Sequence, residues 1–293
     1  MENQHIIDFK CTGEVLESIP EEIIRATGIT FPDAHKNFNY MSILSRELKN
    51  KKNDSLCRIP FCVTVEAEAL GGNIKLGDIK AGPRVESYAF NSVEELSSMG
   101  EIDFNKGRIK EVLKAVEGLK GQGEVVALSV EGPFTIAASL IDPAALYRGI
   151  RKNKELIDIF FKKIENSIVS YILEGIKKGA EIISYGDPIG ALDIVGPKLY
   201  QEYSGRITYN ILKRIEPSLK GVIVHLCGKT STAFEKYNLS KSVPIEVEEG
   251  ITYGEALTKI ISENKNIKFI GNSCIKRSAF KLSKSIIWQI QLN

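Results

Sequence analysis

No uncharged apolar run in the 293-residue sequence approaches the ~18 residues that a membrane-spanning helix needs. The first residues, MENQHIIDFK, contain neither a basic region nor an apolar core, so we expect no secretory signal there. An excess of one charge is also missing, because 39 basic residues are balanced by 37 acidic ones and the formal net charge is +2. The composition therefore gives no reason to expect a nucleic-acid or membrane partner.

Cysteine is scarce, with five residues at positions 11, 57, 62, 227 and 274. An odd number scattered along a long chain does not make a disulfide framework, so we expect a reducing, cytoplasmic environment. The phosphate-binding motifs G-x-G-x-x-G and G-x-x-x-x-G-K-[ST] are absent, and so is the zinc motif H-E-x-x-H. These absences weigh against dinucleotide enzymes, nucleoside-triphosphate enzymes and that class of zinc protease.

Strand-like and helix-like segments alternate from Arg58 onward. Apolar, β-branched runs predict strands at Ile59–Val65, within Lys75–Phe90, and at Val125–Val130, Glu181–Tyr185, Val222–Leu226, Pro244–Val247, Lys268–Ile270 and Ile286–Gln291. Helical patterns between them cover Lys110–Gly118, Pro133–Arg148, Lys154–Lys178, Pro197–Ile215 and Tyr253–Glu263.

This alternation indicates an α/β fold with a parallel sheet. About eight strands favour a (β/α)8 TIM barrel over an open sheet. We expect a single domain overall, in which residues 58–293 form the barrel and residues 1–57 form an N-terminal helical and loop extension packed on it. The pattern predicts one helix in that extension, at Phe38–Lys49.

The stretch GVIVHLCGKTS, residues 221–231, holds one of three histidines and one of the five cysteines. Side chains two apart on a strand point to the same face, so His225 and Cys227 are expected to project together where the strand ends. Imidazole nitrogen and thiolate sulfur are both zinc ligands, and a catalytic zinc site commonly uses three protein ligands. An H-x-C pair alone is more typical of an ordinary core strand, in which the cysteine is a small buried hydrophobe.

Other polar residues also follow predicted strands. They are Glu66 and Glu68, Glu131, Asp187, Glu248 and Glu249, and the turn Asn272-Ser273-Cys274. In a barrel of this class the carboxyl ends of the strands carry the active site, so these side chains are expected to share one rim. Each acid has an alternative role in a turn or as a helix cap. Cys274 follows the strand-like IKFIG, and its sulfur could be the third ligand beside His225 and Cys227.

Several blocks of the chain together resemble a known family. They are FPDAHKN followed by Met41, PFCVTVEAEALGGNIKLGDIKAGPRV, VEGPFTIAASL, GDPIGALDIVGPKLYQEY, VHLCG and FIGN, and they run in order from Phe31 to Asn272. The sequence is thereby similar to the uroporphyrinogen decarboxylase superfamily, and most similar to its methylcobamide:coenzyme M methyltransferases. The arginine-rich N-terminal motif of true uroporphyrinogen decarboxylases is not found before Arg58.

The resemblance implies a (β/α)8 barrel that holds zinc and moves a methyl group from a methylated corrinoid, carried on a partner protein, to a thiol. The H-x-C pair matches His225 and Cys227, and Cys274 stands in for a family cysteine that usually lies further along the chain. Glu66, Glu131 and Asp187 are the candidates to complete the open metal position or to accept the thiol proton. Tyr185 and Asn272 are the candidates to orient the substrate.

The methyl acceptor is left open by the sequence: it is coenzyme M, another small thiol, or a folate. Two other functions are also compatible with the residues. One is a tetrapyrrole decarboxylase or related lyase that uses no metal. The other is a catalytically silent barrel that binds a corrinoid protein, which the short segment after Cys274 keeps in consideration.

Overall fold

The computed structural model describes residues 19–263 and 266–293. His5 and Cys11, with the rest of the first 18 residues of the predicted N-terminal extension, lie outside the described part. The described part of the extension contains the helices α1 (Glu21–Thr27) and α2 (Phe38–Lys52). Asn37 begins α2, because its side-chain oxygen accepts hydrogen bonds from the backbone N–H groups of Asn39 and Tyr40.

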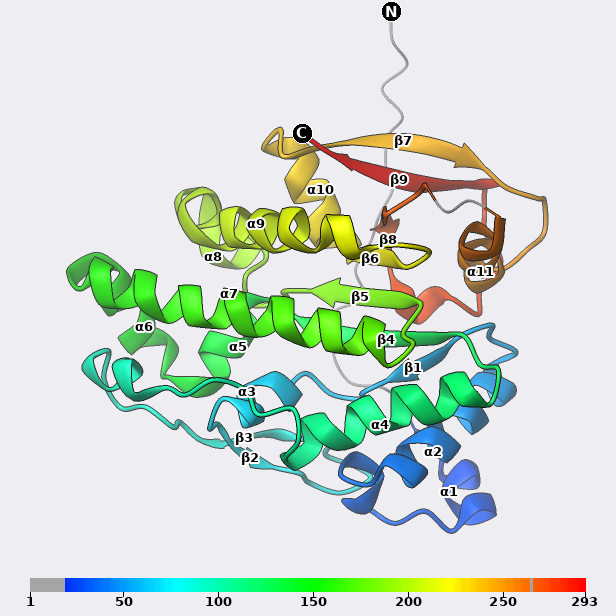
Figure 1. Ribbon diagram of the computed structural model, residues 1–293, viewed down its shortest axis with the longest axis horizontal. Coiled ribbons are helices and arrows are strands. Elements are labelled where there is room, and N and C mark those ends of the chain that lie inside the picture. Colours follow the sequence, from blue (N-terminus) through cyan, green and yellow to red (C-terminus); the bar gives the residue numbers. More distant parts are fainter. Residues whose placement is uncertain (1–18, 264–265) are drawn as a thin grey trace, which may run out of the picture.

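A mostly parallel sheet forms the centre of the molecule (Figure 1). Its strands are β1 (Cys57–Ile59), β4 (Val126–Glu131), β5 (Ile182–Gly186), β6 (Ile223–Cys227), β8 (Phe269–Ser273), β9 (Ile286–Leu292) and β7 (Ser240–Glu246), in the order β1-β4-β5-β6-β8-β9-β7. The first five of these are mutually parallel, whereas β9 runs antiparallel to both β8 and β7. The predicted α/β fold is therefore confirmed.

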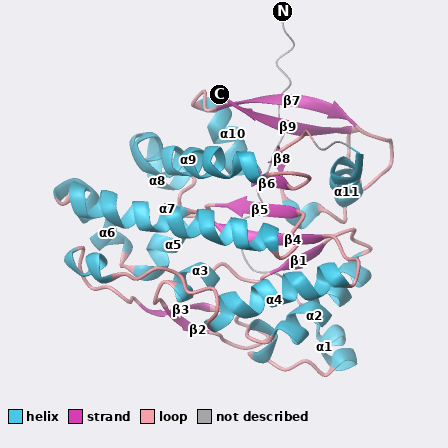
Figure 2. Cartoon of the chain, viewed as in Figure 1, coloured by secondary structure: helices cyan, strands magenta, loops and turns pink. Residues whose placement is uncertain are grey.

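Two strand predictions differ in detail from the structure. The strand expected at Ile59–Val65 ends at Ile59, because Pro60 has no backbone N–H to continue the ladder. The strand expected within Lys75–Phe90 is an antiparallel pair, β2 (Asn73–Lys75) and β3 (Arg84–Ser87), which forms a sheet of its own. Figure 2 shows this pair far from β7 and β9, which run side by side at the opposite end.

Helices cover the outside of the strands. They are α3 (Val65–Ala69), α4 (Gly107–Gly121), α5 (Pro133–Leu140), α6 (Pro143–Lys152), α7 (Lys154–Lys177), α8 (Leu192–Leu199), α9 (Gly205–Ile215), α10 (Gly228–Lys236) and α11 (Tyr253–Glu263), with short 3-10 turns at Asp33–His35, Glu94–Ser98, Glu216–Ser218 and Ile275–Arg277 and a π turn at Tyr200–Ser204. Both α4 and α7 contact β4, and Figure 1 shows α7 running alongside β4 and β5. None of the helices in the described residues is both long and apolar enough to cross a bilayer.

The helix expected over Pro133–Arg148 is two helices. Asp142 interrupts it, since its carboxylate accepts a hydrogen bond from the backbone N–H of Ala145 at 3.0 Å and so begins α6. Pro143 occupies the first position of α6, where a missing N–H costs nothing.

The inner face of the parallel strands changes from apolar to polar along the strand direction. Ala127, Ile182 and Ile223 are paired across β4, β5 and β6, and they belong to one buried apolar cluster. Two residues further on, Ser129, Ser184 and His225 occupy the same face in the same register. The apolar cluster therefore forms the floor on which a polar site is built at the carboxyl ends of the strands.

Candidate active site

A cavity of about 390 Å³ opens at the carboxyl ends of β4, β5, β6 and β8. Its walls come from the segment after β1, from these four strand ends, and from the first turn of α10. The lining residues are Arg58, Pro60, Phe61, Cys62, Val63, Ser129, Glu131, Ser184, Tyr185, Gly186, Asp187, Pro188, Ile189, His225, Cys227, Lys229, Thr230, Cys274, Ile275 and Lys276. All three predicted metal ligands, and the predicted residues Glu131, Asp187 and Tyr185, thus meet at one cavity.

His225 is the most deeply buried of the predicted ligands, with 1% of its surface exposed. Neither ring nitrogen has a hydrogen-bond partner in the described structure. Burial lowers the pKa of His225 to about 4, so the imidazole is neutral at physiological pH and has a lone pair to donate. The ring of Tyr253, on α11, packs edge-on against it at a centroid distance of 5.8 Å. A buried imidazole with no protein partner, facing a cavity, is arranged to bind something from that cavity.

The two cysteines reach the same cavity from neighbouring strands. Cys227 is the last residue of β6 and is paired across the sheet with Ser273, so Cys274 lies one residue beyond that pair. Between His225 and Cys227 the ladder is irregular, because β6 advances two residues while β8 advances three. The extra residue of β8 coincides with Asn272, whose backbone has a positive φ of 56°.

The donor types of this trio fit a zinc ion, since one imidazole and two thiols are among the ligands that zinc prefers. The unpartnered nitrogens of His225 are the structural observation that supports the fit. In the part of the chain that the structure describes, no three His, Cys, Asp or Glu side chains stand close enough to form a finished metal cluster. The three predicted ligands share the cavity without already converging on one point.

Asp187 is buried, and its carboxylate accepts hydrogen bonds from backbone and side-chain donors. Its oxygens accept hydrogen bonds from the N–H groups of Phe134 (3.1 Å), Thr135 (2.8 Å) and Gly190 (3.1 Å), and from the Thr135 hydroxyl (2.7 Å). Burial raises the pKa of Asp187, although these bonds oppose the shift. Gly132 is required nearby, because a Cβ there would lie 2.3 Å from the Cβ of Asp187. Asp187 therefore caps α5 from the neighbouring strand.

Glu66 and Glu131 form a buried pair beside the cavity. Glu66, on α3, is 1% exposed, and one of its carboxyl oxygens accepts the backbone N–H of Glu131 at 2.9 Å. Burial raises the pKa of Glu66 to about 7, although the Glu131 N–H and the guanidinium of Arg108 oppose the shift. The pKa of Glu131 is also raised, first by burial and then by the nearby carboxyls of Glu66 and Asp187. Of the two, only Glu131 lines the cavity.

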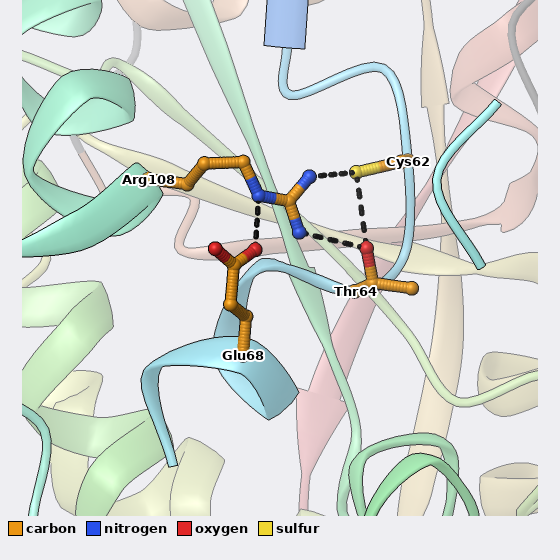
Figure 3. A network of polar contacts seen from close by, with 4 residues as sticks. All are labelled: Cys62, Thr64, Glu68 and Arg108. Atoms are coloured by element: carbon orange, nitrogen blue, oxygen red, sulfur yellow. Dashed lines mark hydrogen bonds and ion pairs between the residues drawn. The ribbon is translucent and has the colours of Figure 1, made fainter. Parts of the chain in front are cut away.

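A four-residue network fixes the wall after β1 (Figure 3). Arg108, at the start of α4, is 4% exposed and donates to the thiol of Cys62 at 3.3 Å and to the hydroxyl of Thr64 at 2.9 Å. Its Nε forms an ion pair with Glu68 on α3. Because Cys62 lines the cavity, this network ties the cavity wall to two helices.

Several residues do not lie where the sequence alone places them. The hydroxyl of Tyr185 is bonded to Thr208 of α9 at 2.9 Å, so it points outward from the strand although the residue lines the cavity. The amide of Asn272 donates to Ser242 of β7 at 2.8 Å, and Asn272 is not among the lining residues. Glu248 lies away from the cavity, where it forms an ion pair with Lys259.

Sequence reasoning did not anticipate the three basic residues of the lining, Arg58, Lys229 and Lys276. Lys229 forms an ion pair with Asp193 of α8 at 2.8 Å. Two of these basic residues adjoin predicted ligands in the sequence, since Lys229 follows Cys227 by two positions and Lys276 follows Cys274 by two. That spacing was the available signal, because residues just after a strand end tend to fold over the site.

Comparison with known proteins identifies the family. The family model described as uroporphyrinogen decarboxylase (URO-D) matches residues 9–273, which is most of the chain. The protein therefore belongs to the uroporphyrinogen decarboxylase family.

Within that family, the similar curated proteins include methyltransferases. The methylcobamide:CoM methyltransferase MtbA of Methanosarcina acetivorans is 24% identical over 254 residues, a match that covers 86% of this chain and 74% of the relative. The corresponding MtaA of Methanosarcina barkeri is 23% identical over 255 residues with the same coverage. The uroporphyrinogen decarboxylase of Francisella philomiragia is 24% identical over 239 residues, covering 77% of this chain and 68% of that protein.

A solved methyltransferase from Methanosarcina mazei has the same fold. It superposes with a TM-score of 0.66 at 19% identity, covering 76% of this chain and 68% of the solved one. The predicted resemblance and the predicted barrel class are confirmed by these matches. In the described residues the ladder pairings end at β1 on one side and at β7 on the other, and the antiparallel β7 and β9 take the place of further parallel strands.

Proposed function

We propose that this protein is a zinc-dependent methyltransferase that moves a methyl group from a methylated corrinoid, carried on a partner protein, to a thiol such as coenzyme M. The observation that carries this proposal is the buried, unpartnered imidazole of His225, which faces a cavity that also contains Cys227 and Cys274. The similarity to methylcobamide:CoM methyltransferases supports the reaction class.

His225, Cys227 and Cys274 would hold the zinc, and the cavity would leave its fourth position to the substrate. When bound, zinc lowers the pKa of a coordinated thiol and keeps the sulfur available as a nucleophile. The neutral imidazole that burial enforces suits this role, because only an unprotonated nitrogen can donate to a metal.

The rest of the cavity would bind and orient the acceptor. Arg58 and Lys276 place positive charge on its walls, which suits a thiol that carries an anionic group. Phe61 and Ile189 add apolar surface. The proposed reaction requires that a corrinoid carried on another protein reach this cavity. Substrate roles for Tyr185 and Asn272 stay predictions, since the polar groups of both are bonded to neighbouring elements.

The experiment that tests the proposal measures metal and methyl transfer together. Purified protein reconstituted with zinc is analysed by elemental mass spectrometry, beside His225→Ala, Cys227→Ser and Cys274→Ser. Each preparation is then assayed for transfer of methyl from methylcobalamin to coenzyme M. We expect about one zinc per chain in the wild type, loss of zinc in all three variants, and thiol methylation only where zinc is bound. The buried Cys57 of β1 provides a control, since it is not among the lining residues and Cys57→Ala should retain the metal.

Three results would contradict the proposal. A wild-type protein that binds no zinc after reconstitution would exclude the predicted ligand set. Zinc binding without methyl transfer, but with association to a methylated corrinoid protein, would instead favour the catalytically silent barrel. Loss of a carboxyl group from a tetrapyrrole in the absence of metal would favour the decarboxylase alternative.

A further inference from the structure

The proposed reaction releases a proton that some group must accept. A free thiol has a pKa near ~8.5, so the acceptor enters the cavity mostly with its S–H bond intact. Three carboxyls adjoin the cavity, and the structure distinguishes them by what each already binds. Both oxygens of Asp187 are occupied by the donors of α5 and of the Gly190 turn.

Glu66 is likewise committed, and it is set back from the cavity. Its carboxyl accepts the backbone N–H of Glu131, and it is not among the lining residues. Glu131 differs from both, because its carboxyl lines the cavity and no hydrogen bond or ion pair joins that carboxyl to another residue of the described chain. It ends β4, two strands away from His225 and Cys227 on β6. A side chain that is 8% exposed and faces the cavity is therefore available to the substrate.

The surroundings of Glu131 strengthen it as a proton acceptor. The charge of Glu131 reaches the buried hydroxyls of Tyr171 and Tyr185. Four ionisable groups act on the pKa of Glu131 itself: the carboxyls of Glu66 and Asp187, the Cys62 thiol and the Lys276 ammonium. Three of these four oppose a negative charge on Glu131, and burial does so more strongly, so its pKa is raised. A carboxylate with a raised pKa binds a proton more tightly than an exposed one and approaches the ideal for a base near neutral pH.

We propose that Glu131, backed by Glu66, is the catalytic residue that takes the proton from the acceptor thiol. This inference rests on the proposed function. In the step, the S–H bond of the thiol breaks, the proton binds a carboxylate oxygen of Glu131, and the electron pair stays on sulfur. Sulfur then bonds to the methyl carbon of the methylated corrinoid, the carbon–cobalt bond breaks, and its electron pair stays on the corrinoid. The proton leaves Glu131 for solvent after the methylated thiol departs.

Glu66 has a positioning role in this scheme. Its negative charge raises the proton affinity of Glu131, and the two carboxyls titrate together. The Glu131 backbone N–H that Glu66 accepts favours the ionised form of Glu66 and so keeps that charge beside Glu131. Removing the Glu66 charge should lower the pKa of Glu131. Because Glu131 must be ionised to accept the proton, the acid limb of the pH–rate profile should then move to lower pH.

The first test compares two acceptor thiols in zinc-loaded protein with methylcobalamin as the methyl donor. One acceptor is an alkanethiol, which is protonated at the assay pH, and the other is an aryl thiol, which is already ionised. Glu131→Gln should lower the rate with the alkanethiol by about 100-fold or more, the usual contribution of a positioned base, and lower it much less with the aryl thiolate. Glu165→Gln serves as the control, because this buried glutamate of α7 lies outside the cavity lining and binds Lys162 and Arg214.

The second test follows the proton directly and does not depend on turnover. Infrared difference spectra recorded on adding the alkanethiol should show a gain of protonated carboxyl in the wild type and in Glu165→Gln, and none in Glu131→Gln.

A third test, which does use turnover, addresses Glu66. In Glu66→Gln, the acid limb of the pH–rate profile should shift to lower pH. A purely structural role of either residue would leave the infrared band and the limb unchanged.

The outcomes separate this inference from the proposed function. Equal loss of rate with both thiols in Glu131→Gln, or an infrared band that survives in that variant, would overturn the proton role while leaving the methyl transfer intact. A wild-type enzyme that methylates neither thiol would overturn the proposed function, and this inference with it.

Discussion

Thr135 donates two hydrogen bonds to Asp187, one from its backbone N–H at 2.8 Å and one from its hydroxyl at 2.7 Å. The two residues are 52 positions apart in the sequence, and the contact joins the turn after β5 to the first turn of α5. Asp187, which lines the cavity, is therefore held by the helix that follows β4.

Replacing Asp187 by alanine should destabilise the protein by about 3 kcal/mol, because three buried N–H groups and one hydroxyl lose their acceptor. Urea unfolding of the wild type and the variant measures this difference. Asp187→Asn should cost less, since its amide oxygen still accepts from some of the same donors. Unchanged stability in Asp187→Ala would contradict the capping role.

The pH dependence of stability should report on Glu66. Its pKa is about 7 in the folded protein, above the ordinary value of 4.5, so folding favours the protonated form. The stability contribution of this group is complete below pH 4.5 and is lost as the pH rises through about 7. Glu66→Gln should therefore be more stable than the wild type at pH 8, by on the order of 1 to 3 kcal/mol, and similar to it at pH 4.5.

Urea unfolding at several pH values tests this expectation. Glu117→Gln on α4 is the matched control, because its side chain is 60% exposed and its neutralisation should change little. A Glu66→Gln variant that loses stability at pH 8 would show that the carboxylate form is the one the fold requires.

The Arg108 network should hold the cavity wall in place. Arg108→Met leaves the hydroxyl of Thr64 and the carboxylate of Glu68 without the guanidinium, at a cost of about 3 kcal/mol. Hydrogen exchange of the segment between β1 and α3 should become faster, because its tie to α4 is lost. Arg46→Met is the control, since the hydrogen bond from Arg46 to Gln122 is exposed. Equal exchange in both variants would exclude the network as the support of this wall.

The cysteines should differ in reactivity. Burial and the nearby Glu124 raise the pKa of Cys57 to about 11, so little thiolate forms there at pH 8. Cys227 and Cys274 are partly exposed at the cavity. Iodoacetamide at pH 8 should label these two and leave Cys57 unmodified, and zinc should protect both. Peptide mass spectrometry with and without zinc measures the pattern, and labelling of Cys57 at the same rate would contradict it.

Much of the site was predictable because strand alternation places polar residues at the carboxyl ends of parallel strands. This pattern predicts His225, Cys227, Cys274, Glu131 and Asp187 at one rim, and all five line the cavity, while their chemical roles stay predictions. What spacing does not encode is which donors surround a side chain once the chain has folded. The capping role of Asp187 depends on a helix that begins 54 residues earlier, at Pro133, and the outward hydroxyl of Tyr185 depends on Thr208.

The sequence pattern also did not predict the strand directions at the β7 edge of the sheet. The run Pro244–Val247 has the composition of a buried parallel strand, yet β7 pairs antiparallel with β9. The composition of a segment indicates whether it favours a β-strand, but it does not indicate whether the neighbouring strand runs parallel or antiparallel to it. The division of the chain at residue 57 stays a prediction.

The irregular pairing of β8 makes the site depend on chain length as well as on residue identity. A deletion of Asn272 would leave every proposed ligand in the sequence, but it would remove the extra residue that sets Ser273 opposite Cys227. Because successive residues of a strand face opposite sides, a shift of one position would redirect Cys274 relative to His225. Among relatives of this protein, a one-residue gap at the position of Asn272 would therefore mark chains that keep all three ligand residues but lose their arrangement around one cavity.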